Sequence, residues 1–93
     1  EVLQAEGPVL VDLFAAWCGP CRALAPVLET LAEARPELRI GKVDVDAQPE
    51  LAARFDVLTV PTLLLFRSGR LLRRTTGAKT PAELEEFLRS GEA

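Results

Sequence analysis

Apolar residues occur along this chain in two patterns, as short, nearly continuous runs and as runs with a helical period. The nearly continuous runs at about residues 9–16 and 62–66 have the length and composition of buried strands. Between them, aliphatic residues recur at the i, i+3, i+4 and i+7 spacing of one helical face, at Leu24, Val27, Leu28 and Leu31. This spacing predicts a helix from residue 19 to about residue 34. Pro26 should bend that helix without ending it, because the apolar period continues beyond it.

Shorter apolar runs and their boundary residues indicate the elements in the middle of the chain. Residues 39–45 read as a second strand, and Gln48 with Pro49 opens a short helix through Phe55. Residues 67–70 turn the 62–66 strand into a fourth strand at 71–76. These last two strands are therefore expected to form a hairpin.

The two ends of the chain each carry a helix signal. Thr80 as N-cap, Pro81 at the first position and Glu83 three residues after the cap form a capping box. The apolar face of this last helix consists of Leu84, Phe87 and Leu88. At the other end, residues 2–5 look like the tail of a short helix that Gly7 and Pro8 stop.

The order strand, helix, strand, helix, hairpin, helix predicts a single α/β domain spanning residues 1–93. Its centre should be a mixed sheet of about four strands, flanked by helices on both faces. Arginines at positions 70, 73 and 74 stand where an edge strand needs protection against further pairing, which favours a solvated edge over an anion site. The chain shows no internal repeat, linker or low-complexity segment.

Charge and composition limit the classes of partner. A net charge of −3, from 11 basic and 14 acidic residues, offers no footprint for nucleic acid and no polybasic membrane anchor. The longest apolar runs are too short to span a bilayer. No secretory signal is visible, and the cysteine usage suits a reducing cytosol, so we expect a cytoplasmic protein. Because the chain has no methionine, Glu1 is not expected to be the translation start, and a removed leader or a larger parent protein stays open.

The two cysteines of the chain, Cys18 and Cys21, stand three residues apart between a predicted strand and a predicted helix. At this spacing in the first turn of a helix, the two sulfurs lie close enough to form a disulfide. The partial positive charge of the helix N-terminus favours a thiolate on Cys18, which makes it the expected attacking sulfur. Cys21 is then placed to resolve a mixed disulfide. Pro20 suits the first turn, and Gly19 allows another chain to approach closely.

Three other interpretations of the cysteines are weaker. A structural disulfide that closes so short a loop would remove little entropy from the unfolded chain. A zinc site needs about four ligands, and without histidine or a third cysteine only carboxylates or a second subunit could complete one. The absence of histidine also excludes a Cys-His nucleophile. We therefore expect a redox site and no bound metal.

Asp12 interrupts an otherwise apolar strand. A strand covered on both faces leaves little room for water, so burial should raise the pKa of this carboxyl and make it available for proton transfer near neutral pH. Alternatively, the strand end dips into solvent at this point. Lys42, on the neighbouring predicted strand, either pairs with Asp12 beneath the cysteines or extends to the surface.

Motifs over nearly the whole chain together resemble the thioredoxin family. They are residues 9–12, 17–21, Pro26, 42–46, 60–62, Phe66, Gly69 and Gly77. The resemblance implies that Cys18 is the nucleophile, Cys21 the resolving thiol, Asp12 the buried proton-transfer carboxylate and Lys42 its modulator. It also implies a cis Pro61 that faces the cysteines; from the residues alone, cis and trans cannot be told apart. The implied substrate-docking surface is flat and apolar and consists of Trp17, Gly19, Pro20, Thr59, Val60, Pro61, Gly77 and Ala78.

The chain departs from the family pattern at two places. Phe14 stands where the family often has a second tryptophan. The family's first strand and most of its first helix are missing at the start, so segment 39–45 is expected to become an edge of the sheet.

These features predict a thiol–disulfide oxidoreductase that reduces disulfides in other proteins through reversible oxidation of the Cys18–Cys21 dithiol. We expect a monomer with no bound cofactor. The resemblance implies recycling by the flavoenzyme thioredoxin reductase, with NADPH as the indirect electron source. Two alternatives stay open. One is an oxidase or isomerase with the same motif, but the Gly-Pro pair between the cysteines resembles that of reductants. The other is an appended interaction domain of a larger protein, but the intact set of Cys18, Cys21, Asp12 and Pro61 argues against it.

Overall fold

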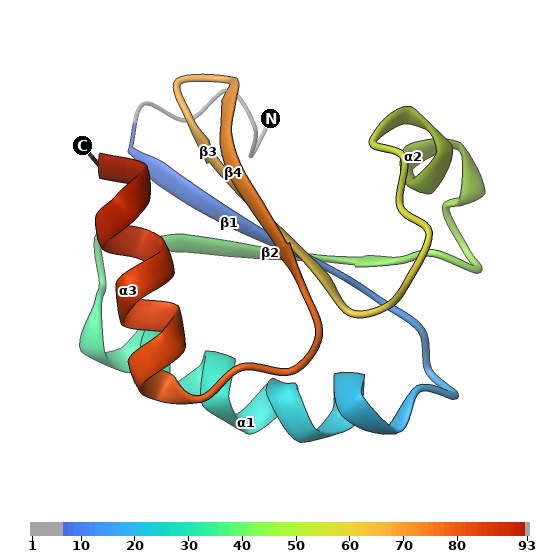
Figure 1. Cartoon of the computed structure of the whole chain (residues 1–93), viewed down its shortest axis with the longest axis horizontal. Helices are drawn as coiled ribbons and strands as arrows, with labels where there is room; N and C mark the ends of the chain where they lie inside the picture. The colour runs from blue at the N-terminus through green and yellow to red at the C-terminus, as the bar shows by residue number, and fades with distance from the viewer. Residues whose placement is uncertain (1–6, 93) are drawn as a thin grey trace.

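The computed structural model describes residues 7–92, with only the backbone of residues 90–92. Its strands are β1 (Pro8–Phe14), β2 (Arg39–Asp44), β3 (Thr62–Arg67) and β4 (Arg70–Thr76), and its helices are α1 (Gly19–Ala34), α2 (Pro49–Arg54) and α3 (Pro81–Glu92). The strands form one mixed sheet in the order β2-β1-β3-β4, drawn in Figure 1. β1 runs parallel to β2 and antiparallel to β3, and β3 and β4 form the expected hairpin.

The predicted fold class and every predicted element within the described residues are confirmed, and all but one of the predicted boundaries agree with the structure within one residue. The first strand ends at Phe14 and not at residue 16. The backbone turns there, because the N–H of Cys18 donates a hydrogen bond of 3.1 Å to the carbonyl of Ala15. α1 continues through Pro26 without a break. The helix tail expected at residues 2–5 lies outside the described residues.

Helices cover both faces of the sheet and divide the core into two main clusters. α1 and α3 lie over one face, and α2 lies over the other (Figure 1). The first cluster consists of Leu10, Leu24, Leu28, Leu31, Leu38, Leu63, Leu65, Leu84, Phe87 and Leu88. The second consists of Val9, Val11, Leu13, Leu64 and Phe66, with Phe55 and Val57 packed against it. Alternate residues of β1 and β3 point to opposite faces, so both central strands are buried on both sides.

The two edges of the sheet match expectation. β2 is one edge of the described sheet, which confirms the expected position of segment 39–45. β4 is the other edge, and the arginines at 70, 73 and 74 are exposed along it. Two of these arginines make contacts with other residues of the chain. The Arg73 guanidinium lies 5.5 Å from the ring centre of Phe87, and Arg74 donates hydrogen bonds of 2.8 and 3.3 Å to the carbonyls of Phe55 and Asp56.

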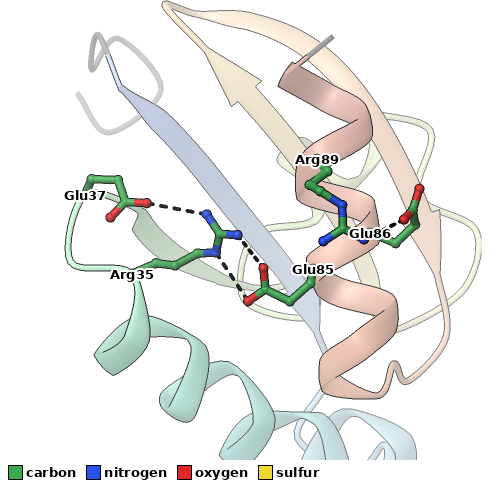
Figure 2. A network of polar contacts seen from close by, with 5 residues as sticks. All are labelled: Arg35, Glu37, Glu85, Glu86 and Arg89. Carbon is green, nitrogen blue, oxygen red and sulfur yellow. Dashed lines mark hydrogen bonds and ion pairs between the residues drawn. The ribbon is translucent and has the colours of Figure 1, made fainter.

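An ion-pair network connects the end of α1 to α3 (Figure 2). Arg35, the C-cap residue of α1, donates through Nε and a terminal nitrogen to the two carboxylate oxygens of Glu85 on α3. The other terminal nitrogen lies 3.6 Å from Glu37. The hydrogen bond from Arg35 lowers the pKa of Glu85, although that carboxyl is at the surface. This bidentate ion pair links the end of α1 to α3, which are far apart in sequence, whereas an ion pair within one helix links only neighbouring turns.

Replacing Arg35 with methionine is expected to lower the free energy of unfolding more than replacing Arg89 with methionine. Arg89 pairs with Glu86 within α3 at exposed positions, where ion pairs contribute little (Figure 2). Because the pKa of Glu85 is lowered in the folded state, the contribution of its pair with Arg35 is present above the unfolded pKa and is lost as the pH falls through the folded one. Urea unfolding of both variants at neutral and acidic pH measures this. An equal loss in both variants at neutral pH would contradict the expectation.

Candidate active site

The two cysteines form a disulfide at the point where β1 passes into α1. Cys18 is the N-cap of the helix, with extended backbone angles of φ −88° and ψ 115°, and its Cα lies 5.3 Å from that of Cys21. Only 4% of Cys18 and 5% of Cys21 is exposed, and both pack in a small cluster with Ala15. The expected Cys18–Cys21 pairing is thus confirmed.

The start of α1 provides a favourable environment for negative charge on Cys18. The backbone N–H of Cys21 donates a hydrogen bond of 3.1 Å to the Cys18 sulfur, which takes the acceptor position of a helix N-cap. Pro20 lies in the first turn, where the backbone N–H that proline lacks would have no acceptor within the helix. That turn contains no acidic residue, so nothing in it cancels the positive end of the helix dipole. These features favour the thiolate form of Cys18 when the disulfide is reduced.

The loop before β3 lies against the disulfide. The carbonyl oxygen of Val60 is 3.8 Å from the Cys18 sulfur, and the Val60–Pro61 peptide is cis, as expected. The N–H of Gly77 donates a hydrogen bond of 2.9 Å to the carbonyl of Pro61. The Thr62 hydroxyl donates a bond of 2.7 Å to the carbonyl of Thr59. These bonds bring segments 59–62 and 77 to the same end of the sheet as the cysteines.

Asp12 is buried in the middle of the sheet, on β1. It is 1% exposed, and its Oδ1 has no hydrogen-bond partner within the described part of the chain. On β1 it shares a face with Leu10, which belongs to the cluster covered by α1 and α3. Burial raises the pKa of Asp12 from 3.8 to about 6, and the charge of Lys42 opposes this rise. The alternative of a solvated strand end is wrong, because the residue lies in the core.

Comparison with known proteins identifies the family of this chain. The thioredoxin family model matches residues 1–90. The chain belongs to the thioredoxin family. Thioredoxin from Mycobacterium tuberculosis H37Rv is 49% identical over 85 residues, which are 90% of this chain and 73% of that protein. Thioredoxin from Alicyclobacillus acidocaldarius is 44% identical over 89 residues, 95% of this chain and 85% of the relative.

Solved thioredoxin structures show the same arrangement. Thioredoxin from Fasciola hepatica superposes with a TM-score of 0.88 at 39% identity, covering 95% of this chain and 84% of the other. Oxidised mitochondrial thioredoxin 3 from Saccharomyces cerevisiae gives a TM-score of 0.87 at 34% identity, covering 95% and 82%. The bifunctional thioredoxin reductase/thioredoxin of Mycobacterium leprae is also 49% identical, but this chain spans only 19% of its length.

Membership of the thioredoxin family and the disulfide together define the chemistry. The protein is a thiol–disulfide oxidoreductase of the protein-disulfide reductase type, and its redox-active group is the Cys18–Cys21 pair. Within the described residues, no three or more Cys, Asp or Glu side chains gather where they could hold a metal ion. None of the helices described for this chain has the length and apolar character needed to cross a membrane.

The structure places Lys42 differently from the other residues expected at this thioredoxin site. It lies opposite Asp12 in the register of β1 and β2, but it is exposed, and its amino group lies 5.5 Å from the ring centre of Phe14. Its charge still lowers the pKa of Asp12. Of the two alternatives for Lys42, the structure therefore shows the extension to the surface, with the amino group over the Phe14 ring.

The residues expected at the docking surface differ in how far they are exposed. Trp17 is 69% exposed, Pro61 is buried, and Gly77 adopts a left-handed φ of +89°, which favours glycine. A side chain at Gly19 would meet nothing within 4 Å, so this position borders open space. The remaining members, Pro20, Thr59 and Ala78, are exposed, and Val60 is half-buried.

The sequence analysis missed two residues that neighbour members of this expected surface. Asp46 accepts a hydrogen bond of 2.8 Å from the indole nitrogen of Trp17. The sequence signal for Asp46 was a local turn. The Asp44 side chain accepts a hydrogen bond of 2.9 Å from the Asp46 N–H, and this turn positions the Asp46 side chain. Leu58, which is 93% exposed, had no signal in the hydrophobic pattern.

Proposed function

We propose that Cys18 attacks and that Cys21 resolves during reduction of disulfides in other proteins. The Cys18 thiolate displaces one sulfur of the substrate disulfide as a thiolate and forms a mixed disulfide with the other. Cys21 then loses its proton, attacks the Cys18 sulfur and releases the second substrate sulfur. The Cys18–Cys21 disulfide remains, and two electrons have passed to the substrate. The observation that carries this assignment is the hydrogen bond from the Cys21 N–H to the Cys18 sulfur at the start of α1.

We further propose that Asp12 accepts the proton that Cys21 loses. Its burial and its pKa of about 6 support this role, because a carboxyl with that pKa can hold or release a proton near neutral pH. Lys42 modulates the carboxyl through its charge. A substrate segment docks on the surface of Trp17, Gly19, Pro20, Thr59, Val60, Pro61, Gly77 and Ala78.

Recycling by thioredoxin reductase, with electrons from NADPH, completes the proposed cycle. The Mycobacterium leprae relative, whose name joins the two activities, supports this choice of partner. The proposal places the protein in the cytoplasm as a single-domain monomer. Sedimentation of the purified chain tests the monomer, and the thiol state of the cysteines after rapid alkylation of cells tests the compartment.

A coupled assay with NADPH, a bacterial thioredoxin reductase and insulin as the disulfide substrate tests the proposed function. NADPH oxidation should depend on both the chain and insulin and should continue for many turnovers. Omitting insulin should leave a single stoichiometric consumption that reduces the Cys18–Cys21 disulfide. If dithiothreitol-reduced protein also fails to cleave insulin disulfides, the proposed reductase function is wrong, whatever the reductase partner.

A further inference from the structure

Phe14, the last residue of β1, contacts both the cysteine pair and Lys42. Its side chain packs against the cluster formed by Ala15, Cys18 and Cys21. The Lys42 ammonium lies 5.5 Å from the centre of its ring, which is within the range of a cation–π contact. Phe14 is half-buried and Lys42 is exposed, so this contact lies where the cysteine cluster meets the surface.

The pairing of β1 with β2 brings Phe14, Lys42 and Asp12 to one face of the sheet. Asp12 and Phe14 are two residues apart on β1, and side chains at that spacing point to the same face. Lys42 is the partner of Asp12 in the parallel register of the two strands. The lysine backbone is therefore next to the carboxyl, while the ammonium lies over the neighbouring ring.

The ring offers the Lys42 ammonium an attractive position that the carboxyl does not. None of the ion pairs formed by the described residues joins Lys42 to Asp12. Asp12 is 1% exposed, so an ammonium that approached it closely would lose its water. Over the half-buried ring the ammonium keeps much of that water and still gains an electrostatic attraction. Without the ring, hydration would draw the flexible side chain outwards.

Among the described residues, Lys42 is the charged group whose field reaches Asp12. β1 carries no other charge, and the residue opposite Asp12 on β3 is Leu63. The side chains that α1 and α3 pack against this face are apolar, apart from Cys21, which does not titrate while it is in the disulfide. The Asp44 carboxylate, further along β2, accepts hydrogen bonds of 2.9 and 3.4 Å from backbone N–H groups of the turn that follows.

We propose that Phe14 is a positioning residue for the redox reaction, whose ring holds the Lys42 ammonium where its positive charge reaches the Asp12 carboxylate. In this role Phe14 touches no reacting atom and acts through Lys42. The inference rests on the proposed proton transfer from Cys21 to Asp12, because that step makes the placement of the charge matter for turnover. The Lys42 charge lowers the pKa of Asp12 against the effect of burial, so loss of the ring should raise this pKa.

Carboxyl-carbon NMR titration of Asp12 in the oxidised protein tests the proposal. Phe14→Leu removes the ring but keeps an apolar side chain against the cysteine cluster. It should raise the proton-binding constant of Asp12 about two- to fivefold, the range that an exposed cation–π contact spans. Phe14→Trp retains an aromatic face and should keep the constant at or below the wild-type value. Lys42→Met should raise it, and adding Phe14→Leu to Lys42→Met should change it no further.

Arg73→Met is the matched control. It removes an equally distant cation–π contact, with the Arg73 guanidinium 5.5 Å from the ring centre of Phe87, and should leave the titration of Asp12 unchanged. An equal effect of Phe14→Leu with and without Lys42 would overturn the proposal, because the ring would then act through the burial of Asp12. A proton-binding constant that falls or stays the same in Phe14→Leu alone would also overturn it.

The wild-type protein provides a test that does not depend on the folding of any variant. A ring current from Phe14 should shift the ε-methylene protons of Lys42 upfield, and the shifts of a freely moving lysine would overturn the proposal. The rate of substrate release from the mixed disulfide near pH 6 should fall in Phe14→Leu, because fewer Asp12 carboxyls are ionised there. A shifted titration with an unchanged release rate would overturn the proposed proton transfer, and with it the role of Phe14 in turnover. An unshifted titration would overturn the role of Phe14 alone.

Discussion

Replacing Cys18 with serine is expected to reduce the rate of protein-disulfide reduction to that of the uncatalysed reaction. The variant has no sulfur at the N-cap of α1, where the Cys21 N–H and the helix dipole favour a thiolate. Replacing Cys21 with serine should have a different effect. The Cys18 attack still occurs, but no second sulfur resolves the mixed disulfide, so the enzyme stops as a covalent complex after one reaction with each substrate.

Non-reducing electrophoresis and intact mass spectrometry after mixing each reduced variant with insulin distinguish these outcomes. Cys21→Ser should accumulate an adduct that dithiothreitol releases, and Cys18→Ser should form none. The two variants are matched controls for each other, because each retains one of the two cysteines of the chain. Equal adduct formation by both variants would contradict the assignment of Cys18 as the nucleophile.

Replacing Asp12 with asparagine is expected to stabilise the folded protein above pH 7. Burial raises the pKa of Asp12 from 3.8 to about 6, so between these values the folded protein binds a proton that the unfolded chain has released. The free energy of unfolding of the wild type therefore falls as the pH rises from about 4 to about 6. A shift of about two pKa units corresponds to roughly 3 kcal/mol. Asparagine carries no charge at any pH and should avoid this loss.

Urea unfolding of wild type and Asp12→Asn at pH 4 and pH 8 measures the effect on stability. The variant should be more stable than the wild type at pH 8, by up to roughly 3 kcal/mol, and the difference should become small at pH 4. Both proteins should be compared in the oxidised state, so that the disulfide contributes equally. A difference between the two proteins that does not depend on pH would contradict the raised pKa.

The same substitution should slow the release of substrate from the mixed disulfide. Without the carboxylate, Cys21 must lose its proton to water, and the loss of a positioned proton acceptor costs on the order of 10²-fold in rate. The wild-type release rate should rise with pH through an inflection near 6, and Asp12→Asn should lack that inflection. Stopped-flow recording of the mixed disulfide over a pH series tests this. If the variant keeps the same inflection, the inflection belongs to a titrating group other than Asp12.

Local signals in the sequence predicted most of the fold. The Thr80–Glu83 capping box forms as expected, with bonds of 2.9 and 3.1 Å between each side chain and the backbone N–H of the other residue. The cysteine pair is equally local, because three residues of helix determine its geometry. The start of α1 at Gly19 and the placement of Cys18 as its N-cap follow from the same turn.

Features that depend on distant parts of the chain were less accessible to sequence analysis. Trp17 and Asp46 are 29 positions apart, and only the pairing of β1 with β2 brings them together. The apolar pattern could mark Leu58 as hydrophobic but could not show that it is exposed beside a groove. Lys42 was predicted on the strand next to that of Asp12, but its register opposite Asp12 and the position of its amino group over Phe14 depend on how the strands pair and pack.

The reduction potential of the Cys18–Cys21 pair tests the central claim most directly. The protein is equilibrated in dithiothreitol buffers of defined ratio, and the fluorescence of Trp17, the sole tryptophan, follows the adjacent disulfide. A reversible two-electron transition well below the potential of the glutathione pool is expected, because a protein-disulfide reductase must donate electrons to its substrates. A potential near or above that of glutathione would contradict the reductase assignment and would indicate an oxidase or isomerase.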